Sequence, residues 1–175
     1  QDVDITAAVS IIDADGEEIT GTLTFDVIPF NDAPTATNTD QTLTYTEGDS
    51  SVAIDDIVIT EVDTIVASDD ETSENLTVTV TLSDSAAGAL TADSDEGESF
   101  DSSTGVWSIS GVSEETASTA LASMAFEPAT NQDVDITAAV SITDADGEEI
   151  TGTLTFDVTP ANDAPTATNT DQTLT

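Results

Sequence analysis

The sequence contains no lysine, arginine or histidine, although 37 of its 175 residues are aspartate or glutamate. Its formal net charge is therefore −37 at pH 7. No carboxylate can pair with a basic side chain, so a compact fold suffers self-repulsion unless cations gather among the acidic groups. We expect no nucleic-acid partner, because that affinity comes from Lys and Arg that neutralise phosphates. The composition leaves two possibilities, namely spread and solvated charges or bound metal ions.

Cysteine is also missing, so the disulfides that stabilise many small secreted domains are excluded. Aromatic residues make up 4% of the chain and hydrophobic residues 37%, so the core must consist mainly of Val, Ile, Leu and Ala. No apolar run approaches the roughly 20 residues of a membrane-spanning helix, and we expect no direct membrane insertion. No signal peptide is visible and the chain begins within a pattern, so we interpret it as a fragment of a longer protein.

The chain contains a long internal repeat. Its first 44 residues recur as residues 132–175, at an offset of 131 residues. Only three positions differ: Ile12/Thr143, Ile28/Thr159 and Phe30/Ala161. A unit of this length is a whole domain rather than one turn of a solenoid. The sequence therefore predicts a linear array of complete, monomeric domains.

The boundaries between these domains are marked by a short turn-forming segment. Asn31-Asp32-Ala33-Pro34 recurs as Asn162-Asp163-Ala164-Pro165, each time just after a strand-like run. We therefore predict that residues 1–32 are the C-terminal part of one repeat, residues 33–163 a complete repeat, and residues 164–175 the start of the next. Residues 1–30 are then part of a sandwich with an unpaired edge, which either packs on the complete repeat or pairs with another chain.

Several runs alternate apolar and polar residues with the period of a half-buried strand. They are Leu43–Thr46, Ile57–Thr60, Leu76–Leu82, Val106–Ile109, Val134–Ile142 and Ile150–Val158. A hairpin turn is expected at Ser103-Thr104-Gly105. Such strands suit an antiparallel sandwich in which each sheet has one solvated face. We predict an all-β, Ig-like sandwich with about seven strands and one short helix.

The short helix is predicted after Ser113, whose side chain can cap it. Glu114 and Glu115 then fall in the first turn, where negative charge is favourable. The inner face of this helix is expected to carry Ala117, Leu121 and Met124.

The acidic residues gather in clusters, of which one loop is duplicated. Asp13 and Asp15 precede Gly16 between two predicted strands, and Asp144 and Asp146 repeat the pattern. Alternate Asp residues in a tight turn supply the carboxylate and carbonyl oxygens that Ca²⁺ prefers. The spacing matches neither an EF-hand loop nor the glycine-rich calcium nonapeptide. A plain polar hairpin turn therefore remains the alternative.

Four further clusters are candidate ligands. They are Glu47-Gly48-Asp49, Asp69-Asp70-Glu71 with Glu74-Asn75, Glu114-Glu115, and the Asn-Asp-Ala-Pro segments. Each alone fits a solvated turn. Together, in a chain without basic residues, they favour metal binding.

The domain-length repeat resembles the cadherin-like repeats of giant bacterial RTX adhesins. The resemblance rests on Tyr45–Asp49, Leu76-Thr77-Val78, Thr104–Trp107 and the terminal Asn-Asp-Ala-Pro. It is more distantly similar to cadherins, whose junctions between domains hold calcium. The resemblance implies a cadherin-like sandwich, several Ca²⁺ ions, and an extracellular place on the surface of a Gram-negative bacterium. It further implies a role in adhesion and biofilm formation, with the repeats as spacers.

The resemblance also implies two groups of ligands. At one junction it brings together Asn31, Asp32, Asp69, Asp70 and Asp146. At the other junction it brings together Glu47, Glu114, Glu115, Asn162 and Asp163. The linker departs from the cadherin pattern because Pro29 and Phe30 stand where its first Asp would be, and Asp69-Asp70 lacks the usual intervening residue.

The sequence analysis therefore predicts a calcium-stabilised extender whose partners are the neighbouring repeats of the same chain. A ligand-binding adhesion module for a glycan, a protein or ice is the alternative, suggested by the threonines of Leu76–Leu82. We expect no enzyme, because the absence of Cys, His and Lys removes most nucleophiles and bases. Paired carboxylates, as in glycosidases, and an acidic, salt-adapted surface without specific ions are the remaining alternatives.

Overall fold

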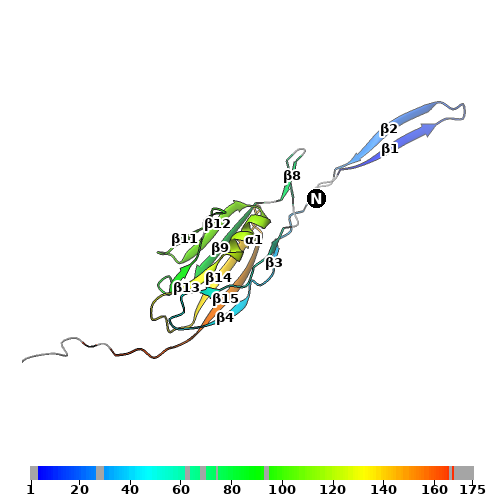
Figure 1. Cartoon of the computed structure of the whole chain (residues 1–175). Helices are drawn as coiled ribbons and strands as arrows, with labels where there is room; N and C mark the ends of the chain where they lie inside the picture. The colour runs from blue at the N-terminus through cyan, green and yellow to red at the C-terminus, as the bar shows by residue number, and fades with distance from the viewer. Residues whose placement is uncertain are drawn as a thin grey trace, which may run out of the picture.

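The computed structural model describes residues 4–26, 30–61, 64–67, 70–73, 75–92, 95–165 and 167, with no side chains for 64–67 and 70–73. Within them, the chain forms strands and one helix, arranged as one β-sandwich preceded by a separate hairpin (Figure 1). No helix in this part of the chain is long and apolar enough to cross a membrane.

The larger sheet of the sandwich has six strands in the order β11-β12-β9-β14-β15-β4. Their bounds are β4 Gln41–Thr46, β9 Leu76–Leu82, β11 Ser99–Asp101, β12 Val106–Val112, β14 Ile136–Thr143 and β15 Glu149–Thr159. All pairs are antiparallel except β15 with β4, which are parallel. Apolar side chains alternate with Thr and Ser along these strands, so one face is buried and the other is solvated.

The opposite layer is a three-stranded sheet in the order β10-β13-β5. It consists of β5 Val52–Ala53, β10 Gly88–Leu90 and β13 Ala125–Pro128. Two small pairs complete the described strands, β3 Thr35–Ala36 with β6 Ile59–Thr60 and β7 Thr64–Ala67 with β8 Asp70–Ser73. β3 and β6 lie where the chain enters the sandwich.

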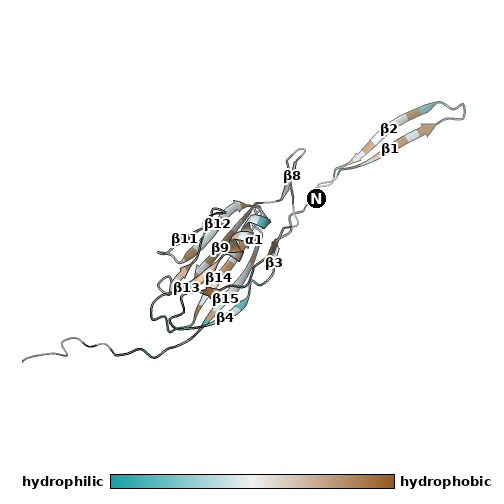
Figure 2. Ribbon diagram, viewed as in Figure 1, coloured by the Kyte–Doolittle hydropathy of each residue, from teal (hydrophilic) through white to brown (hydrophobic). Residues whose placement is uncertain are grey.

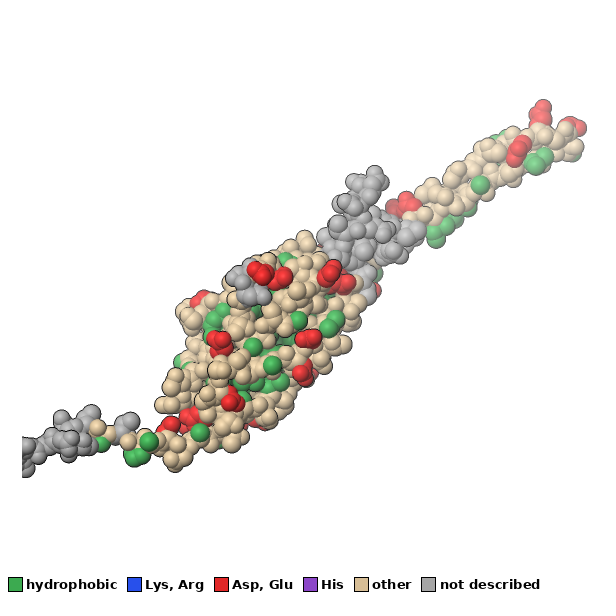
Figure 3. Space-filling view, viewed as in Figure 1, with side chains coloured by type: hydrophobic (Ala, Val, Ile, Leu, Met, Phe, Trp, Pro, Cys, Tyr) green, Lys and Arg blue, Asp and Glu red, His purple; other side chains and the backbone are tan. Residues whose placement is uncertain are grey.

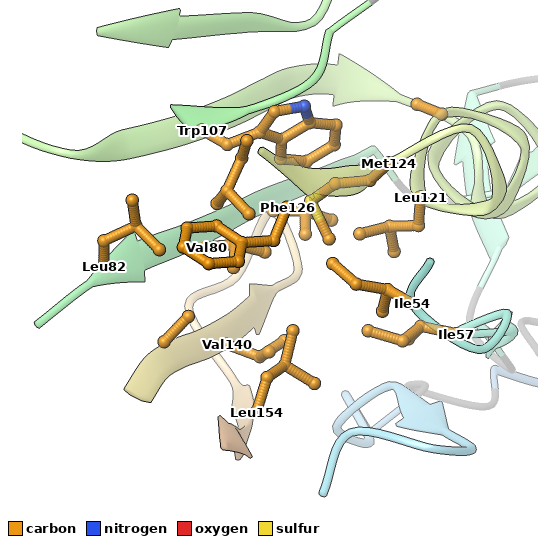
Figure 4. Close-up of a cluster of buried hydrophobic side chains, with 14 of the residues drawn as sticks. Ile54, Ile57, Val80, Leu82, Trp107, Leu121, Met124, Phe126, Val140 and Leu154 are labelled. Atoms are coloured by element: carbon orange, nitrogen blue, oxygen red, sulfur yellow. The ribbon is translucent and has the colours of Figure 1, made fainter. Parts of the chain in front are cut away.

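The core fills the space between the two layers (Figure 4). Trp107, Phe126 and Phe156 are fully buried in it, and Figure 4 shows aliphatic side chains from β9, β14 and β15 around Phe126. The rings of Phe126 and Phe156 lie 4.5 Å apart, and Tyr45 meets Phe126 edge-on at 6.1 Å. These few aromatic side chains therefore provide much of the buried apolar surface in a core that is otherwise aliphatic.

Helix α1, Glu114–Ala122, begins where the sequence predicts it. The backbone N–H of Thr116 donates to the Ser113 side chain, so the predicted cap is confirmed. Ala117 and Leu121 of the predicted inner face are buried in the helix, whereas Met124 is buried just beyond the end of the helix at Ala122. The helix covers the end of the sandwich beside β6 and β12.

The N-terminal hairpin pairs β1 Ile5–Ile12 with β2 Glu18–Phe25 and forms a two-stranded sheet of its own. Its register, Ile5↔Phe25, is that of β14 and β15, Ile136↔Phe156, displaced by one repeat. The core-facing residues of β14–β15 are buried, whereas their copies in β1–β2 are exposed or, for Ala7 and Val9, half-buried. Brown segments in Figure 2 mark these apolar residues on the free hairpin.

The predicted all-β sandwich with one short helix is confirmed. The run Leu76–Leu82 is β9 to the residue, and the turn at Ser103–Gly105 joins β11 to β12. The described strands outnumber the predicted seven, because strands such as β3, β5, β10 and β11 are two- or three-residue pairings too short to show a period in the sequence. Of the predicted run Ile57–Thr60, only Ile59–Thr60 is paired, as β6.

Candidate functional site

The sandwich has two ends that carry acidic clusters. We call them the entry end, at residues 31–35 and the β14–β15 loop, and the exit end, at Glu47 and residues 159–163. β15 has 11 residues and runs from one end to the other, so the ends are roughly 35 Å apart. Acidic side chains are spread over the face in Figure 3 with no basic side chain among them.

At the entry end, Asp144 is buried in the β14–β15 loop. Its Oδ1 accepts hydrogen bonds from the backbone N–H groups of Gly147 at 2.7 Å and Glu148 at 2.8 Å. Its Oδ2 accepts one from the side-chain amide of Asn31 at 3.0 Å. The linker before the domain is therefore attached to the loop that the sequence analysis singled out. Asp146, in the same loop, and Asp32 are exposed.

The copy of this loop in the free hairpin makes a similar turn without burial. Oδ1 of Asp13 accepts from the backbone N–H groups of Asp15 and Glu17, and Asp13 and Asp15 are exposed. Local sequence thus determines the turn, and the packing of the complete domain with its linker buries the carboxylate.

Replacing Asp144 by Ala is expected to lower the free energy of unfolding by about 1–3 kcal/mol, because the N–H groups of Gly147 and Glu148 lose their acceptor. Asp13→Ala is the matched control, since the same turn is exposed in the hairpin. Urea unfolding followed by Trp107 fluorescence measures the domain alone. Equal midpoints for the two variants would show that the buried hydrogen bonds contribute nothing.

The predicted position of Glu114 and Glu115 is wrong. The Glu114 carboxylate accepts a hydrogen bond from the backbone N–H of Glu61, which follows β6 next to the start of β3. α1 therefore begins at the entry end, far from Glu47. The reason is that α1 connects β12 to β13 and starts where β12 ends. A ligand role for either residue stays a prediction, now at the entry end.

At the exit end, Glu47 is attached to the linker that leaves the domain. Its backbone N–H donates to the carbonyl of Thr159 at 3.0 Å, and its Oε2 accepts from the backbone N–H of Ala161 at 2.8 Å. This pairing continues the parallel register of β4 and β15. The carboxylate therefore lies against the linker, as the grouping of Glu47 with Asn162 and Asp163 requires.

A pocket of about 330 Å³ opens beside this contact. Its acidic lining comes from two segments of the chain, Glu47 and Asp49 from one and Asp163 from the other. The loop before β14 closes it with Asn131, whose positive φ of 60° turns the backbone at this point. Oδ2 of Asp49 accepts from the N–H of Thr46. Asn162 is exposed, and its amide donates to the carbonyl of Asp163.

Asp135 lies at the same end, because its Oδ1 accepts a hydrogen bond from the backbone N–H of Val158 at 2.9 Å. Val158 is the β15 partner of Tyr45. Burial, and then the negative charges of Asp135 and Glu47, raise the pKa of the Tyr45 hydroxyl above its ordinary value of 10.0. The two carboxylates therefore act on the same buried phenol, whose oxygen has no hydrogen-bond partner in the described part of the chain.

This pKa shift predicts a loss of stability at high pH. In the unfolded chain the phenol loses its proton at the ordinary pKa, whereas the folded domain holds the proton to higher pH, so the free energy of unfolding falls as pH rises above 10.0. The chain has one Tyr and no Lys, Arg or Cys, so no other side chain titrates there. Urea unfolding at pH 9 to 11 should show the fall in the wild type and not in Tyr45→Phe. A parallel fall in both would contradict the assignment.

In the described residues, no three acidic side chains come together closely enough to hold a metal ion alone. At the exit end the donors are hard oxygens that suit Ca²⁺, but Ca²⁺ takes six to eight of them. At the entry end, Asp69 and the side chain of Asp70 lie outside the described residues. Each end of one domain thus offers part of an oxygen site.

Several residues of the exit end are not among the ligands predicted from the sequence. Asp49 belongs to a predicted cluster but not to the predicted ligands, and Asn131 and Asp135 belong to neither. The signal was Asp133-Val134-Asp135 directly before β14, which has the alternate spacing that drew attention to Asp144 and Asp146. Asp135 follows no turn-forming glycine and lies within the predicted strand Val134–Ile142.

Comparison with known proteins gives structural alignments but no family. No family model and no curated protein matches the sequence. Solved chains that align with it include protocadherin gamma B2 extracellular cadherin domains 3–6, at TM-score 0.43 and 10% identity, covering 90% of this chain and 33% of that one. Another is "PcdhgB3 EC1-4", at TM-score 0.38 and 13% identity, covering 88% and 39%.

Mouse cadherin-23 EC22–24 aligns at TM-score 0.32 and 17% identity, covering 92% of this chain and 43% of that chain. The chain thus spans less than half the length of these solved proteins. Because all three TM-scores are below 0.5, the β-sandwich rests on the strand pairing described above and not on these alignments.

Proposed function

We propose that the repeat is a calcium-stabilised, non-enzymatic spacer of a bacterial cell-surface adhesin, stiffened by ions at the junctions between successive domains. The observation that carries the proposal is the arrangement of acidic residues at the exit end. There Glu47 is bonded to the departing linker and shares a pocket with Asp49 and Asp163. Acidic residues from separate segments thus meet at the point where one domain gives way to the next.

The repeat supports the same interpretation. Asn31 and its copy Asn162 lie on either side of the sandwich, 131 residues apart. Asn31 already bonds Asp144 at the entry end. In an array, each junction would therefore combine the exit end of one domain, the shared linker, and the entry end of the next. Two incomplete oxygen sets would together approach the number of ligands that Ca²⁺ requires.

Repulsion between carboxylates favours the binding of cations at the junctions. With no basic residue in the chain, facing domain ends repel one another. Bound Ca²⁺ would supply positive charge between these carboxylates. The residues proposed to hold it at the exit end are Glu47, Asp49, Asp135, Asn162 and Asp163, and those at the entry end are Asn31, Asp32, Asp69, Asp70, Asp144 and Asp146. Glu114 and Glu115 belong with the entry end.

Calorimetric titration of Ca²⁺ into the chain extended by a second complete repeat, which contains a whole junction, tests this proposal. We expect saturable binding with Kd of roughly 10⁻⁴–10⁻³ M, as in extracellular modules, and a loss of one binding event in Glu47→Gln. Glu18→Gln on β2 removes the same charge outside the site and should titrate like the wild type. Binding that is absent, or equally affected by both substitutions, would contradict the proposal.

The alternative is a ligand-binding adhesion module, and the solvated face of the six-stranded sheet favours it. Cross-strand neighbours there form an uncharged hydroxyl row, Ser108, Thr79, Ser141 and Thr151. Such a row is also the ordinary solvated face of a β-sheet. A glycan array and an ice-affinity assay with the whole chain would decide, since a spacer should give no signal in either.

A further inference from the structure

The first and the last strand of the large sheet lie side by side. β4 precedes the other five strands in the sequence and β15 follows them, yet the two are paired, from Gln41 opposite Leu154 to Thr46 opposite Thr159. This pair is parallel, whereas the other pairs of the sheet are antiparallel. The chain enters the sandwich at the entry end, before β4, and leaves it at the exit end, after β15 (Figure 1). A pull along the chain therefore draws β4 and β15 in opposite directions along their own lengths.

Such a pull loads the hydrogen bonds of this pair in shear. The bonds of a parallel ladder run across the strands and are evenly spaced along them, so a force along the strands is shared by all of them at once. A force across the strands at one end would instead open the same bonds one after another. Since forced unfolding is governed by the unfolding rate, bonds that must break together withstand the larger force.

Hydrogen bonds outside the ladder extend the pair at both of its ends. Before β4, the exposed carboxylate of Asp40 accepts a hydrogen bond from the backbone N–H of Thr153 at 2.8 Å. After β4, the backbone N–H of Glu47 donates to the carbonyl of Thr159, and the Glu47 carboxylate accepts from the backbone N–H of Ala161. The bonded contact thus continues from residue 40 to residue 47 of the entering segment.

A steric stop opposes sliding of β4 towards the entry end. The buried residue Thr39 lies so close to Gly152 that a Cβ on this glycine would be 2.3 Å from the Thr39 carbonyl oxygen. Gly152 is the only glycine of β15. Sliding by two residues, the period of one face of a strand, would bring Thr39 onto Ile150, whose side chain packs against the core. The pair thus resists displacement by steric contact as well as by hydrogen bonds.

We infer that the β4–β15 pair is the load-bearing contact of the repeat, a shear pair that keeps the sandwich folded when the array is stretched. The inference rests on the proposed function only for the load, since a spacer between a cell and an attached surface is stretched whenever the two are pulled apart. The resistance itself belongs to the fold and does not require Ca²⁺, which is proposed to bind at the domain ends.

Optical-tweezers measurements on the full chain test the inference. The sequence has no cysteine, so Ala33→Cys and Ala164→Cys, at two exposed positions, attach the DNA handles at the entry and exit ends. A second variant, Ser50→Cys with Ala164→Cys, pulls both strands from the exit end and peels β4 from β15. At one loading rate, the unfolding force should be several times higher in the first geometry, and equal forces would overturn the inference. Both are measured in chelator, so that this test and the test of the proposed function can fail separately.

Two further substitutions, pulled in the first geometry, separate the load-bearing contact from general stability. Asp40→Ala removes the hydrogen bond to Thr153 and should lower the unfolding force. Asp84→Ala is the matched control, because Asp84 is also exposed and accepts one backbone hydrogen bond of 2.8 Å, from Ala86 in the turn after β9. This control should unfold at the wild-type force. A fall of equal size in both variants would overturn the inference, since the force would then reflect overall stability and not the β4–β15 pair.

Discussion

Phe156→Ala is expected to destabilise the domain by about 3–5 kcal/mol, the usual cost of removing a buried aromatic ring. The Phe156 side chain is fully buried and lies 4.5 Å from Phe126. Such a loss is a large part of the ~5–15 kcal/mol that stabilises an ordinary domain. Urea unfolding monitored by Trp107 fluorescence would report it as a lower midpoint.

The chain contains its own control for this substitution. Phe25 has the same sequence neighbours and the same hairpin register, yet it is 54% exposed. Phe25→Ala should therefore leave the midpoint unchanged. If both substitutions lowered it alike, the hairpin would have to be packed against the domain, contrary to the separate sheet described above.

Calcium is expected to raise the melting temperature of the chain extended by a second complete repeat. At about ten times Kd, each independent site contributes roughly 1.4 kcal/mol, so two sites contribute roughly 2.8 kcal/mol. For a domain about as long as the present chain, that corresponds to an increase of roughly 6–11 °C. Differential scanning calorimetry in millimolar Ca²⁺ and in chelator measures the difference.

Magnesium at equal ionic strength is the control for charge screening, because Mg²⁺ demands a smaller, octahedral site. A specific calcium site predicts a much smaller increase with Mg²⁺. Equal increases in melting temperature with both ions would indicate an acidic, salt-adapted surface instead. No increase with either ion would contradict stabilisation by calcium.

The sequence predicted the fold well where a local pattern decides the structure. The alternation in Leu76–Leu82 and the cap at Ser113 depend on neighbouring residues, and both were correct. The near-identical segments form two hairpins with the same register, so local sequence determines this pairing as well. The predicted repeat boundaries stay a prediction.

The candidate site was harder to predict, because its residues meet through the topology. Glu114 was assigned to the wrong end since the sequence does not show that β12 ends beside β6. Asp144, in contrast with Asp13, is buried and accepts a hydrogen bond from Asn31, which lies 113 residues away in the chain. Asp135 lies near Tyr45 because it bonds Val158, which β15 pairs with Tyr45, and the sequence does not show this pairing.

The central claim is that calcium at the junctions turns a string of domains into a rod. Small-angle X-ray scattering of three complete tandem repeats, in millimolar Ca²⁺ and in chelator, tests it most directly. The account predicts a longer maximum dimension and a rod-like distance distribution with Ca²⁺, and a shorter, broader distribution without it. Superimposable scattering curves in the two solutions would contradict it.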